Sequence, residues 1–253
     1  MSVKLKVFSF NLRHETEVDG INNFWNRTGR VLDAIESHKP DLIGFQEVTG
    51  KMRAWLKASL RDYTVYAPSC FDGDSPVIAF RSEVFDLLAV DHAWLSLTPS
   101  VRASRYGLDQ SKYPRMVISV KLKQRDSDTP LRFFNTHLDH KGATARLLAA
   151  VQIMQAISRE DGPFVLTGDF NAAPDTPEIR TILTCPHLPV TDATAALTGT
   201  FHNYGKKEIP TKIDYVFTNA ACTPEESFII EDKPEDGLYI TDHNVVVSYI
   251  TLE

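Results

Sequence analysis

The chain has 253 residues, of which 43% are hydrophobic and 24% are charged. This is ordinary globular composition, which excludes a fibrous or intrinsically disordered protein. Lysine and arginine together number 27 against 33 aspartates and glutamates, giving a net charge of −6. A negative molecule repels polyanions, so this balance disfavours a protein that binds long nucleic acids, although it does not exclude one. We expect residues 1–253 to form a single domain, because large α/β units often exceed the usual length of about 150 residues.

The cysteines and the first residues bear on the cellular compartment. Cys70, Cys185 and Cys222 are odd in number and widely spaced, which matches neither a disulfide framework nor a paired-thiolate zinc site. Residues 3–7 already alternate aliphatic and charged side chains, so they leave no apolar core for a signal peptide, although a leader removed beforehand would leave no trace. No apolar stretch approaches the roughly 18 residues of a membrane span. We therefore expect a cytoplasmic protein.

Strands and helices alternate from the N-terminus onward. Residues 3–7 have the period of a strand with one covered face, and residues 8–12 carry that strand into the interior. The apolar residues of 24–35 then fall on one helical face, and Pro40 ends this helix before the next apolar run at 42–45. The opening unit is therefore strand, helix, strand.

The rest of the chain continues this mixed pattern. Residues 98–115 contain few aliphatic side chains, so we expect a long loop of the kind that shapes specificity. Thr176-Pro177-Glu178 predicts a helix start, with a capping hydroxyl, a proline at the first helical position and an acid in the first turn. No linker or internal repeat divides the chain. Helical patterns also cover 52–60 and 147–154, and strand patterns cover 164–166, 213–217 and 245–250.

Five apolar runs end in acids, amides and histidines. If the runs are strands, these polar residues converge on one rim of a sheet although they lie far apart in the sequence. Four like charges there would cost on the order of 4 kcal/mol per close pair at an effective dielectric near 20, so their convergence requires a cation. The polar ends are Phe10-Asn11, Gln46-Glu47, Asn135 to Asp139, Gly168 to Asn171, and Thr241-Asp242-His243.

The donor atoms in this set suit a hard divalent ion. Carboxylate and amide oxygens are the ligands that Mg²⁺ and Mn²⁺ prefer, and no thiolate accompanies them. Gly168 permits a tight exit from its strand, and Asp169 and Asn171 at i and i+2 point to the same side. Taken alone, that motif is explained equally well by an ordinary turn, and only its occurrence together with the other acids and amides favours a metal site. The oxygen donors are Glu47, Asp169, Asn171, Asp214 and Asp242.

Two histidines are candidates for proton chemistry. His137 ends an apolar run, where it could donate a hydrogen bond to a phosphate oxygen or protonate a leaving group. His243 is the candidate for activating water, with a carboxylate such as Asp214 or Asp169 holding its imidazole in the useful tautomer. Isolated histidines are more often structural, but the neighbouring acids favour the catalytic interpretation.

Further residues are candidates for substrate contact. Asn11 could orient a metal-bound carboxylate or a phosphate, and Arg115 could clamp phosphate oxygens in the bidentate manner of a guanidinium, with a surface ion pair as the alternative. His202 lies in a polar loop rich in lysine that could meet an anionic substrate at the rim, with a solvated lysine pair as the favoured alternative. Trp25 and Arg27, at a helix start, are expected to be packing and supporting groups.

Taken in chain order, these motifs resemble those of the endonuclease/exonuclease/phosphatase superfamily. The resemblance spans residues 8–247 and implies an α/β (α+β) four-layer sandwich, in which two packed mixed β-sheets are flanked by helices and the site lies at one edge of the sheets. One departure is Thr241, where members usually have serine, and since its hydroxyl is kept we expect activity to be retained. The matching motifs are Phe10-Asn11-Leu12-Arg13, Gln46-Glu47-Val48, Asn135 to Asp139, Gly168 to Asn171, Ile213-Asp214-Tyr215 and Asp242-His243.

The resemblance also implies roles for individual residues. Glu47 resembles the principal metal ligand with Asn11 beside it, and Asp242 resembles an acid that contributes to the same metal site. Asp169 with Asn171 resembles the group that binds the nucleophile, the phosphate or a second metal. Asp214 and His243 resemble the orienting acid and the base, and His137 resembles the histidine that stabilises the phosphate.

We therefore expect a phosphoric ester hydrolase that depends on Mg²⁺, with Mn²⁺ as the alternative metal. The expected substrate is a small phosphorylated metabolite, either a sugar phosphate or a phosphodiester, attacked in line by activated water. A metal-dependent nuclease acting on DNA or RNA is the second hypothesis, and a non-catalytic binding module is the third. The sequence leaves open the substrate, the preference for monoesters or diesters, the number of metals, the choice of base between His243 and Asp169, and self-association.

Overall fold

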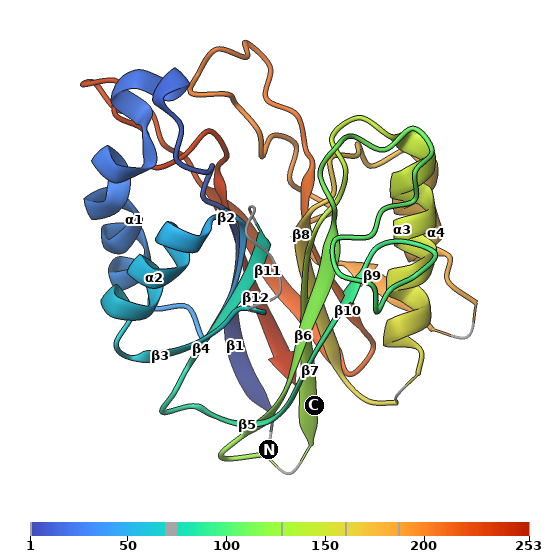
Figure 1. Cartoon of the computed structure of the whole chain (residues 1–253). Helices are drawn as coiled ribbons and strands as arrows, with labels where there is room; N and C mark the ends of the chain where they lie inside the picture. Colours follow the sequence, from blue (N-terminus) through green and yellow to red (C-terminus); the bar gives the residue numbers. More distant parts are fainter. Residues whose placement is uncertain (1, 69–74, 128, 160, 187, 253) are drawn as a thin grey trace.

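Two six-stranded sheets pack face to face in the computed structural model of the chain (Figure 1). The structure describes residues 2–68, 75–127, 129–159, 161–186 and 188–252, so Cys70 lies outside the described residues. The first sheet has the strand order β11-β12-β1-β2-β4-β3. Its strands are β1 (Val3–Asn11), β2 (Leu42–Val48), β3 (Tyr63–Tyr66), β4 (Ser75–Arg81), β11 (Cys222–Ile230) and β12 (Val245–Leu252).

The second sheet has the strand order β5-β6-β7-β8-β10-β9. Each sheet is mixed, because β1 pairs parallel with β2 and β7 pairs parallel with β8, while the remaining pairs are antiparallel. Its strands are β5 (Phe85–Trp94), β6 (Met116–Gln124), β7 (Pro130–His137), β8 (Phe164–Asp169), β9 (Val190–Asp192) and β10 (Asp214–Asn219).

Helices cover the outer face of each sheet (Figure 1). The 3-10 helix η1 (Glu17–Asn22) and the helices α1 (Phe24–His38) and α2 (Gly50–Ser59) lie on the side of the first sheet. The helices α3 (Ala143–Ile157) and α4 (Pro177–Leu183) lie on the side of the second sheet. The expected four-layer sandwich is therefore confirmed. None of the described helices has the length and apolar character needed to cross a membrane.

Three apolar clusters hold the layers together. Val7 and Val165 belong to the cluster between the two sheets, Phe8 packs toward α1 and α2, and Leu166 packs toward α3 and α4. Successive residues of a strand point to opposite faces, so a strand covered on both faces reads as a continuous apolar run. That is why residues 42–45 are apolar without interruption.

The topology brings one end of several strands to a single rim. The parallel strands β1 and β2 end there, as do β7 and β8, whereas the antiparallel β10 and β12 begin there. Both termini lie at the opposite end of the view, and β1 runs from that end to the rim (Figure 1). The expectation that Thr241 to His243 end a strand was therefore wrong: they precede β12. Because β12 runs antiparallel to β1, they still reach the rim.

Candidate active site

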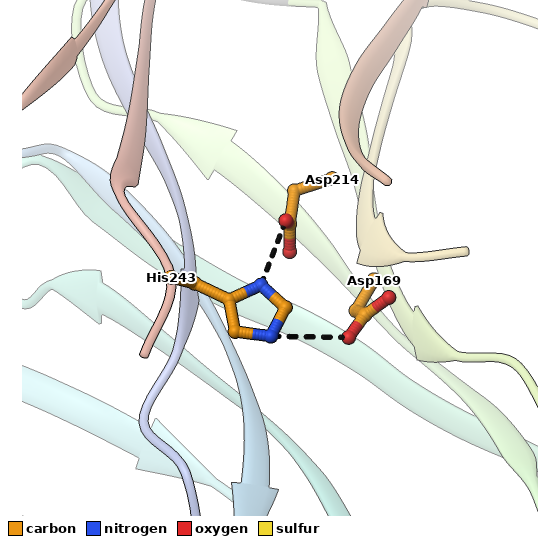
Figure 2. A group of neighbouring side chains, drawn as sticks. All are labelled: Asp169, Asp214 and His243. Carbon is orange, nitrogen blue, oxygen red and sulfur yellow. Dashed lines mark hydrogen bonds and ion pairs between the residues drawn. The ribbon is translucent and has the colours of Figure 1, made fainter. Parts of the chain in front are cut away.

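Three buried side chains form the centre of the rim. Figure 2 shows His243 between two aspartates: its Nδ1 lies 2.8 Å from Asp214 Oδ2, and its Nε2 lies 3.8 Å from Asp169 Oδ2. Asp169 ends β8 and Asp214 begins β10, and the two residues stand opposite each other in the antiparallel register. The sheet thus places both carboxylates beside the loop that carries His243.

Burial and neighbouring charges shift the pKa values of His243 and Asp169. Burial alone would lower the pKa of His243, but the Asp214 carboxylate and the other acids nearby raise it to about 10. Burial, and then the charge of Asp214, raises the pKa of Asp169 to about 7. In the metal-free chain at neutral pH, His243 therefore carries a proton, and Asp169 exchanges one readily.

A second group of side chains surrounds Glu47. His14 Nδ1 lies 2.6 Å from Glu47 Oε2, and Arg13 Nη1 lies 3.8 Å from the same oxygen. Arg13 also lies 4.0 Å from Asp242 Oδ2 and hydrogen-bonds Asp19. Burial opposes ionisation of Glu47, but the hydrogen bond to His14 and nearby positive charges hold its pKa well below the usual range. Glu47 is therefore an ionised carboxylate.

The backbone directs Glu47 and Asn171 into the site. Both residues have left-handed backbone conformations, with φ of 59° and 49°. The pairing of β2 with β4 shifts register between Phe45 and Val48, so the strand is irregular where Glu47 leaves it. Non-glycine residues adopt such φ values at a cost that the surrounding structure must offset, and they concentrate at functional sites.

His137 and Asn171 complete the floor of the site. Asn171 Nδ2 donates to Leu138 O at 3.1 Å and lies 3.1 Å from His137 Nε2, while the Asn171 main-chain N–H donates to Asp169 Oδ1 at 2.9 Å. Burial and the nearby Arg115 hold the pKa of His137 well below its usual range. A neutral imidazole suits hydrogen bonding to a phosphate oxygen better than proton donation to a leaving group.

The oxygen donors fit a hard divalent cation. Burial raises the pKa of both Asp169 and Asp242, so a nearby cation would stabilise the ionised form of each. Glu47 and Asp242 offer carboxylate oxygens to the same cleft, so they would hold the ion. Asp169, Asp214 and His243 are also close enough to share one, although Asp214 already binds His243 Nδ1.

Asn11 acts in this structure through its amide nitrogen. Asn11 Nδ2 donates to Asp169 Oδ2 at 3.0 Å and to Glu47 Oε1 at 3.4 Å, and Asn11 Oδ1 accepts from the main-chain N–H of Arg13. This arrangement orients the two carboxylates, whereas direct ligation of a metal would need the amide oxygen. The role of Asn11 as a ligand stays a prediction.

The site opens into a cleft of about 510 Å³. Most of the sequence-predicted residues line it, while Asn11 and Asp214 are buried beside it and touch residues that line it. The lining residues are Arg13, His14, Glu47, Thr49, Tyr113, Arg115, His137, His140, Asp169, Asn171, Phe201, Ile213, Asp242 and His243.

His202 does not line this cleft, and its expected contact with substrate stays a prediction. Its ring is buried against Tyr239, with centroids 5.3 Å apart, and its Nδ1 accepts from the main-chain N–H of Gly205. Burial lowers the pKa of His202 to about 4, so it is neutral. The aromatic residues of this loop pack together, since Tyr239 contacts the rings of both His202 and Tyr204.

Several residues of the cleft were not predicted from the sequence as site residues. Tyr113 and His140 form a tilted ring pair with centroids 6.0 Å apart, and Phe201 lies 4.8 Å from the ring of His243. Arg13 and His14 lie two and three residues after Asn11, and His140 follows a predicted motif, so proximity in the sequence was a usable signal for these three. Tyr113 and Phe201 also lie within two residues of a candidate, Arg115 or His202, but an aromatic side chain at such a position is equally well explained by packing.

Comparison with known proteins gives a match over nearly the whole chain. The family model described as "Endonuclease/Exonuclease/phosphatase family" matches residues 8–243. The crystal structure of an endonuclease/exonuclease/phosphatase from Bacteroides vulgatus is 28% identical, with a TM-score of 0.91, and the alignment covers 99% of this chain and 100% of that one.

Two more distant structures share the fold. The mannosyl-6-phosphatase Bt3783 of Bacteroides thetaiotaomicron is 24% identical, with a TM-score of 0.85, and the alignment covers 97% of this chain and 99% of that one. The D. rerio protein TDP2, complexed with a single-strand DNA product, is 18% identical, with a TM-score of 0.79 and 98% of each chain covered.

Proposed function

Because the chain belongs to the endonuclease/exonuclease/phosphatase family, whose members hydrolyse phosphoesters, we propose that it is a divalent-metal-dependent phosphoesterase for a small phosphorylated metabolite. The observation that carries this proposal is the convergence of two groups in one cleft. His243, held by Asp214, lies beside Asp169, and the carboxylates of Glu47 and Asp242 line the same cleft, with Asp242 Oδ1 3.9 Å from His243 Nε2. The first group suits proton transfer to and from water, and the second suits cation binding.

Proton transfer and phosphate contact fall to different residues of the cleft in this proposal. Asp214 binds His243 Nδ1, which fixes the tautomer and leaves Nε2 facing the cleft, where it would take the proton of the attacking water. Asp169 is the rival base, because a pKa of about 7 is matched to neutral pH. His137 and Asn171 would lie beside the phosphate; in this structure the Asn171 side-chain N–H groups are directed to Leu138 O and His137 Nε2, so donation to a phosphate oxygen would require one of these bonds to be exchanged.

When bound, a divalent cation of the Mg²⁺ or Mn²⁺ type would neutralise phosphate oxygens and stabilise the charge of the leaving group. Glu47 and Asp242 would hold it, with Asn11 keeping Glu47 and Asp169 in place. The pKa of His243, about 10 in the metal-free chain, is too high for a base at neutral pH, and the positive charge of a bound cation would lower it. The pKa of Asp169 needs no such lowering for Asp169 to act as a base.

The size and charge of the cleft support a small substrate. A volume of about 510 Å³ accommodates one phosphoryl group with a leaving group of sugar size. Apart from histidines, the cations among the described lining residues are Arg13 and Arg115, and each already lies near a carboxylate, Asp19 or Asp139. A surface of this kind binds one phosphate better than a long backbone.

Nuclease activity is the second candidate. A structural neighbour, TDP2, was crystallised with single-strand DNA, whereas another neighbour is a mannosyl-6-phosphatase. The shared fold therefore serves both kinds of substrate. The net charge of −6 favours the metabolite, as does the position of both arginines of the described cleft lining near carboxylates.

One panel of assays tests the proposal. Phosphomonoesters, phosphodiesters and oligonucleotides are incubated with the purified protein in Mg²⁺, in Mn²⁺ and with a chelator. We expect hydrolysis of at least one small ester that the chelator abolishes. A protein inert toward every ester with both metals would contradict the proposal and favour a binding module.

Variants assign the hydrolysis to this cleft. His243→Ala and Asp169→Ala are each expected to lower kcat by about 10²- to 10⁴-fold, the usual effect of losing a general base. His92→Ala is the matched control, because His92 is exposed on β5, outside the lining of the cleft. The variant with the larger loss and an altered acidic limb of the pH profile identifies the base.

A further inference from the structure

Arg27 is a completely buried cation on α1. Its guanidinium donates to four main-chain carbonyl groups: Nε to Asn22 O at 2.6 Å, Nη1 to Ile240 O at 2.5 Å, and Nη2 to Leu12 O and Arg13 O at 2.9 Å each. Within the described part of the chain, no carboxylate lies at ion-pair distance from it. Burying a charge without a counter-ion is costly, so such an arrangement persists only where the hydrogen bonds compensate.

Three of the four carbonyl groups belong to segments that carry the active site, and the fourth, Asn22 O, lies in η1. Leu12 and Arg13 directly follow Asn11 at the end of β1, and Ile240 directly precedes Thr241-Asp242-His243. The same two segments also touch each other, because the Thr241 hydroxyl donates to Asn11 O at 2.8 Å. They are separated by more than 220 residues in sequence. Arg27 is thus a common support for both.

Only a guanidinium can satisfy this set of acceptors. Arginine presents five N–H donors in a rigid planar fork, whereas lysine presents three donors at one point. The acceptors lie on three sides of the group, at Nε, Nη1 and Nη2. A lysine at this position would keep the charge and lose most of the contacts, which allows charge and geometry to be separated by experiment.

We propose that Arg27 is a positioning residue that sets the spacing between the segment at 11–13 and the segment at 240–243, and thereby holds Asp242 and the Asn11-oriented Glu47 at the distance that a divalent cation requires. The inference rests on the proposed function only for its effect on turnover. Its effects on cation affinity and on the rigidity of the two segments do not depend on hydrolysis. Groups that support metal ligands in this way typically change metal affinity by 10- to 100-fold when they are replaced.

The test compares Arg27→Lys and Arg27→Gln with Arg30→Gln. Arg30 lies one turn along the same helix, is partly exposed and pairs with Asp236 at the surface, so it controls for the loss of a cation on α1. Mn²⁺ affinity is measured by titration calorimetry, and amide hydrogen exchange is measured in the metal-free proteins. We expect both Arg27 variants to bind Mn²⁺ 10- to 100-fold more weakly and to exchange faster at 11–13 and 240–243, while Arg30→Gln stays within twofold of wild type.

The outcomes separate the possible explanations. Wild-type Mn²⁺ affinity and wild-type exchange in a folded Arg27→Lys would overturn the proposal, because charge alone would then suffice. If the wild-type protein binds Mn²⁺ but hydrolyses no ester, the proposed function fails while the positioning role is still decided by the affinities. If neither Arg27 variant folds, the wild-type protein with ¹⁵N-labelled arginine decides: the proposal requires slowly exchanging Arg27 Nη protons whose shifts change with Mg²⁺, and freely rotating, unresponsive protons overturn it.

Discussion

At the residue scale, the site is a set of buried acids whose ionisation is uneven. Glu47 is held ionised by His14 and nearby cations, whereas burial moves the pKa of Asp169 to about 7. His243 carries the compensating proton because Asp214 binds it. In the metal-free protein these carboxylates therefore differ in charge state, and a divalent cation would favour the ionised form of each.

The pairing of His243 with Asp214 predicts how the stability of the metal-free protein depends on pH. The folded-state pKa of His243, about 10, lies above the ordinary value of 6.5, so its stabilising contribution is fully present below pH 6.5 and is lost as the pH rises toward 10. Asp169 acts over a different range, because its raised pKa makes its ionisation destabilising between pH 3.8 and about 7. Between pH 7 and pH 10, the His243 contribution therefore dominates.

We expect the free energy of unfolding of the wild-type protein, measured by urea denaturation in chelator, to fall by an amount on the order of 2 to 4 kcal/mol from pH 7 to pH 10. Asp214→Asn should show a flatter profile, because the amide no longer raises the pKa of His243. Parallel profiles for the two proteins would mean that Asp214 does not hold the proton on His243.

The residues of the site could be predicted where they belong to a short polar motif in the sequence. Glu47, Asp169 and His243 each occur beside another polar residue at the end of an apolar run, and the structure brings them into one cleft. His202 does not end an apolar run of this kind, and its expected contact with substrate stays a prediction. Phe201 was missed because an aromatic residue in a loop could equally well belong to the core.

At the scale of the elements, polar contacts join the two sheets directly below the site. Gln46 Nε2 on β2 donates to Asn135 Oδ1 on β7 at 2.8 Å, and Asn135 Nδ2 donates to Phe45 O and Val77 O. Thr167 Oγ1 on β8 donates to the same Asn135 oxygen at 3.1 Å. Because Glu47 lies on one sheet and Asp169 on the other, these bonds set the separation of the two halves of the site.

Gly44 lies where the sheets approach most closely in this network. A Cβ atom added there would overlap Thr167 Oγ1 and lie 2.7 Å from Asn135 Oδ1. We expect Gly44→Ala to destabilise the protein by about 1–3 kcal/mol, the usual cost of overpacking, and to lower kcat because the two halves of the site separate. Urea denaturation and assays on the same substrate measure both effects.

Gly29 provides the matched control for this substitution. It lies within α1, and a Cβ atom there meets nothing within 4 Å. Gly29→Ala should therefore stabilise the protein by about 0.5–1 kcal/mol through helix propensity, with unchanged kcat. Equal effects of the two substitutions would show that Gly44 is not a point of close approach.

The elements were predictable where burial leaves a clear pattern. β2 and β8 are covered on both faces, as are the halves of β1 and β12 nearest the rim, and each strand was predicted from its apolar run or its alternation. The edge strand β5 was not, because most of its side chains are exposed and its sequence lacks the alternation of a half-buried strand. The contact of Gln46 with Asn135 could not be predicted either, since nothing local records a partner 89 residues away.

At the scale of the whole molecule, charge distinguishes a small substrate from a nucleic acid. The net charge of −6 repels a polyanion, and Arg13 and Arg115, the arginines of the described cleft lining, each lie near a carboxylate. A protein that neutralises 6–10 phosphates of duplex DNA loses about 10³- to 10⁵-fold in affinity between 50 and 200 mM salt. A protein that binds one phosphate has no comparable release of counter-ions.

We therefore expect kcat/KM for a small phosphomonoester to change by less than about threefold between 50 and 200 mM KCl at saturating Mg²⁺, since only one phosphate is bound. The direction should be a slight increase, because salt screens the repulsion between the negative protein and its anionic substrate. Steady-state kinetics at constant pH and metal concentration measure the change, and the same series on an oligonucleotide serves as the comparison. Cleavage of the oligonucleotide that is faster at low salt and falls by orders of magnitude across this range would instead identify the cleft as one that follows a nucleic acid backbone.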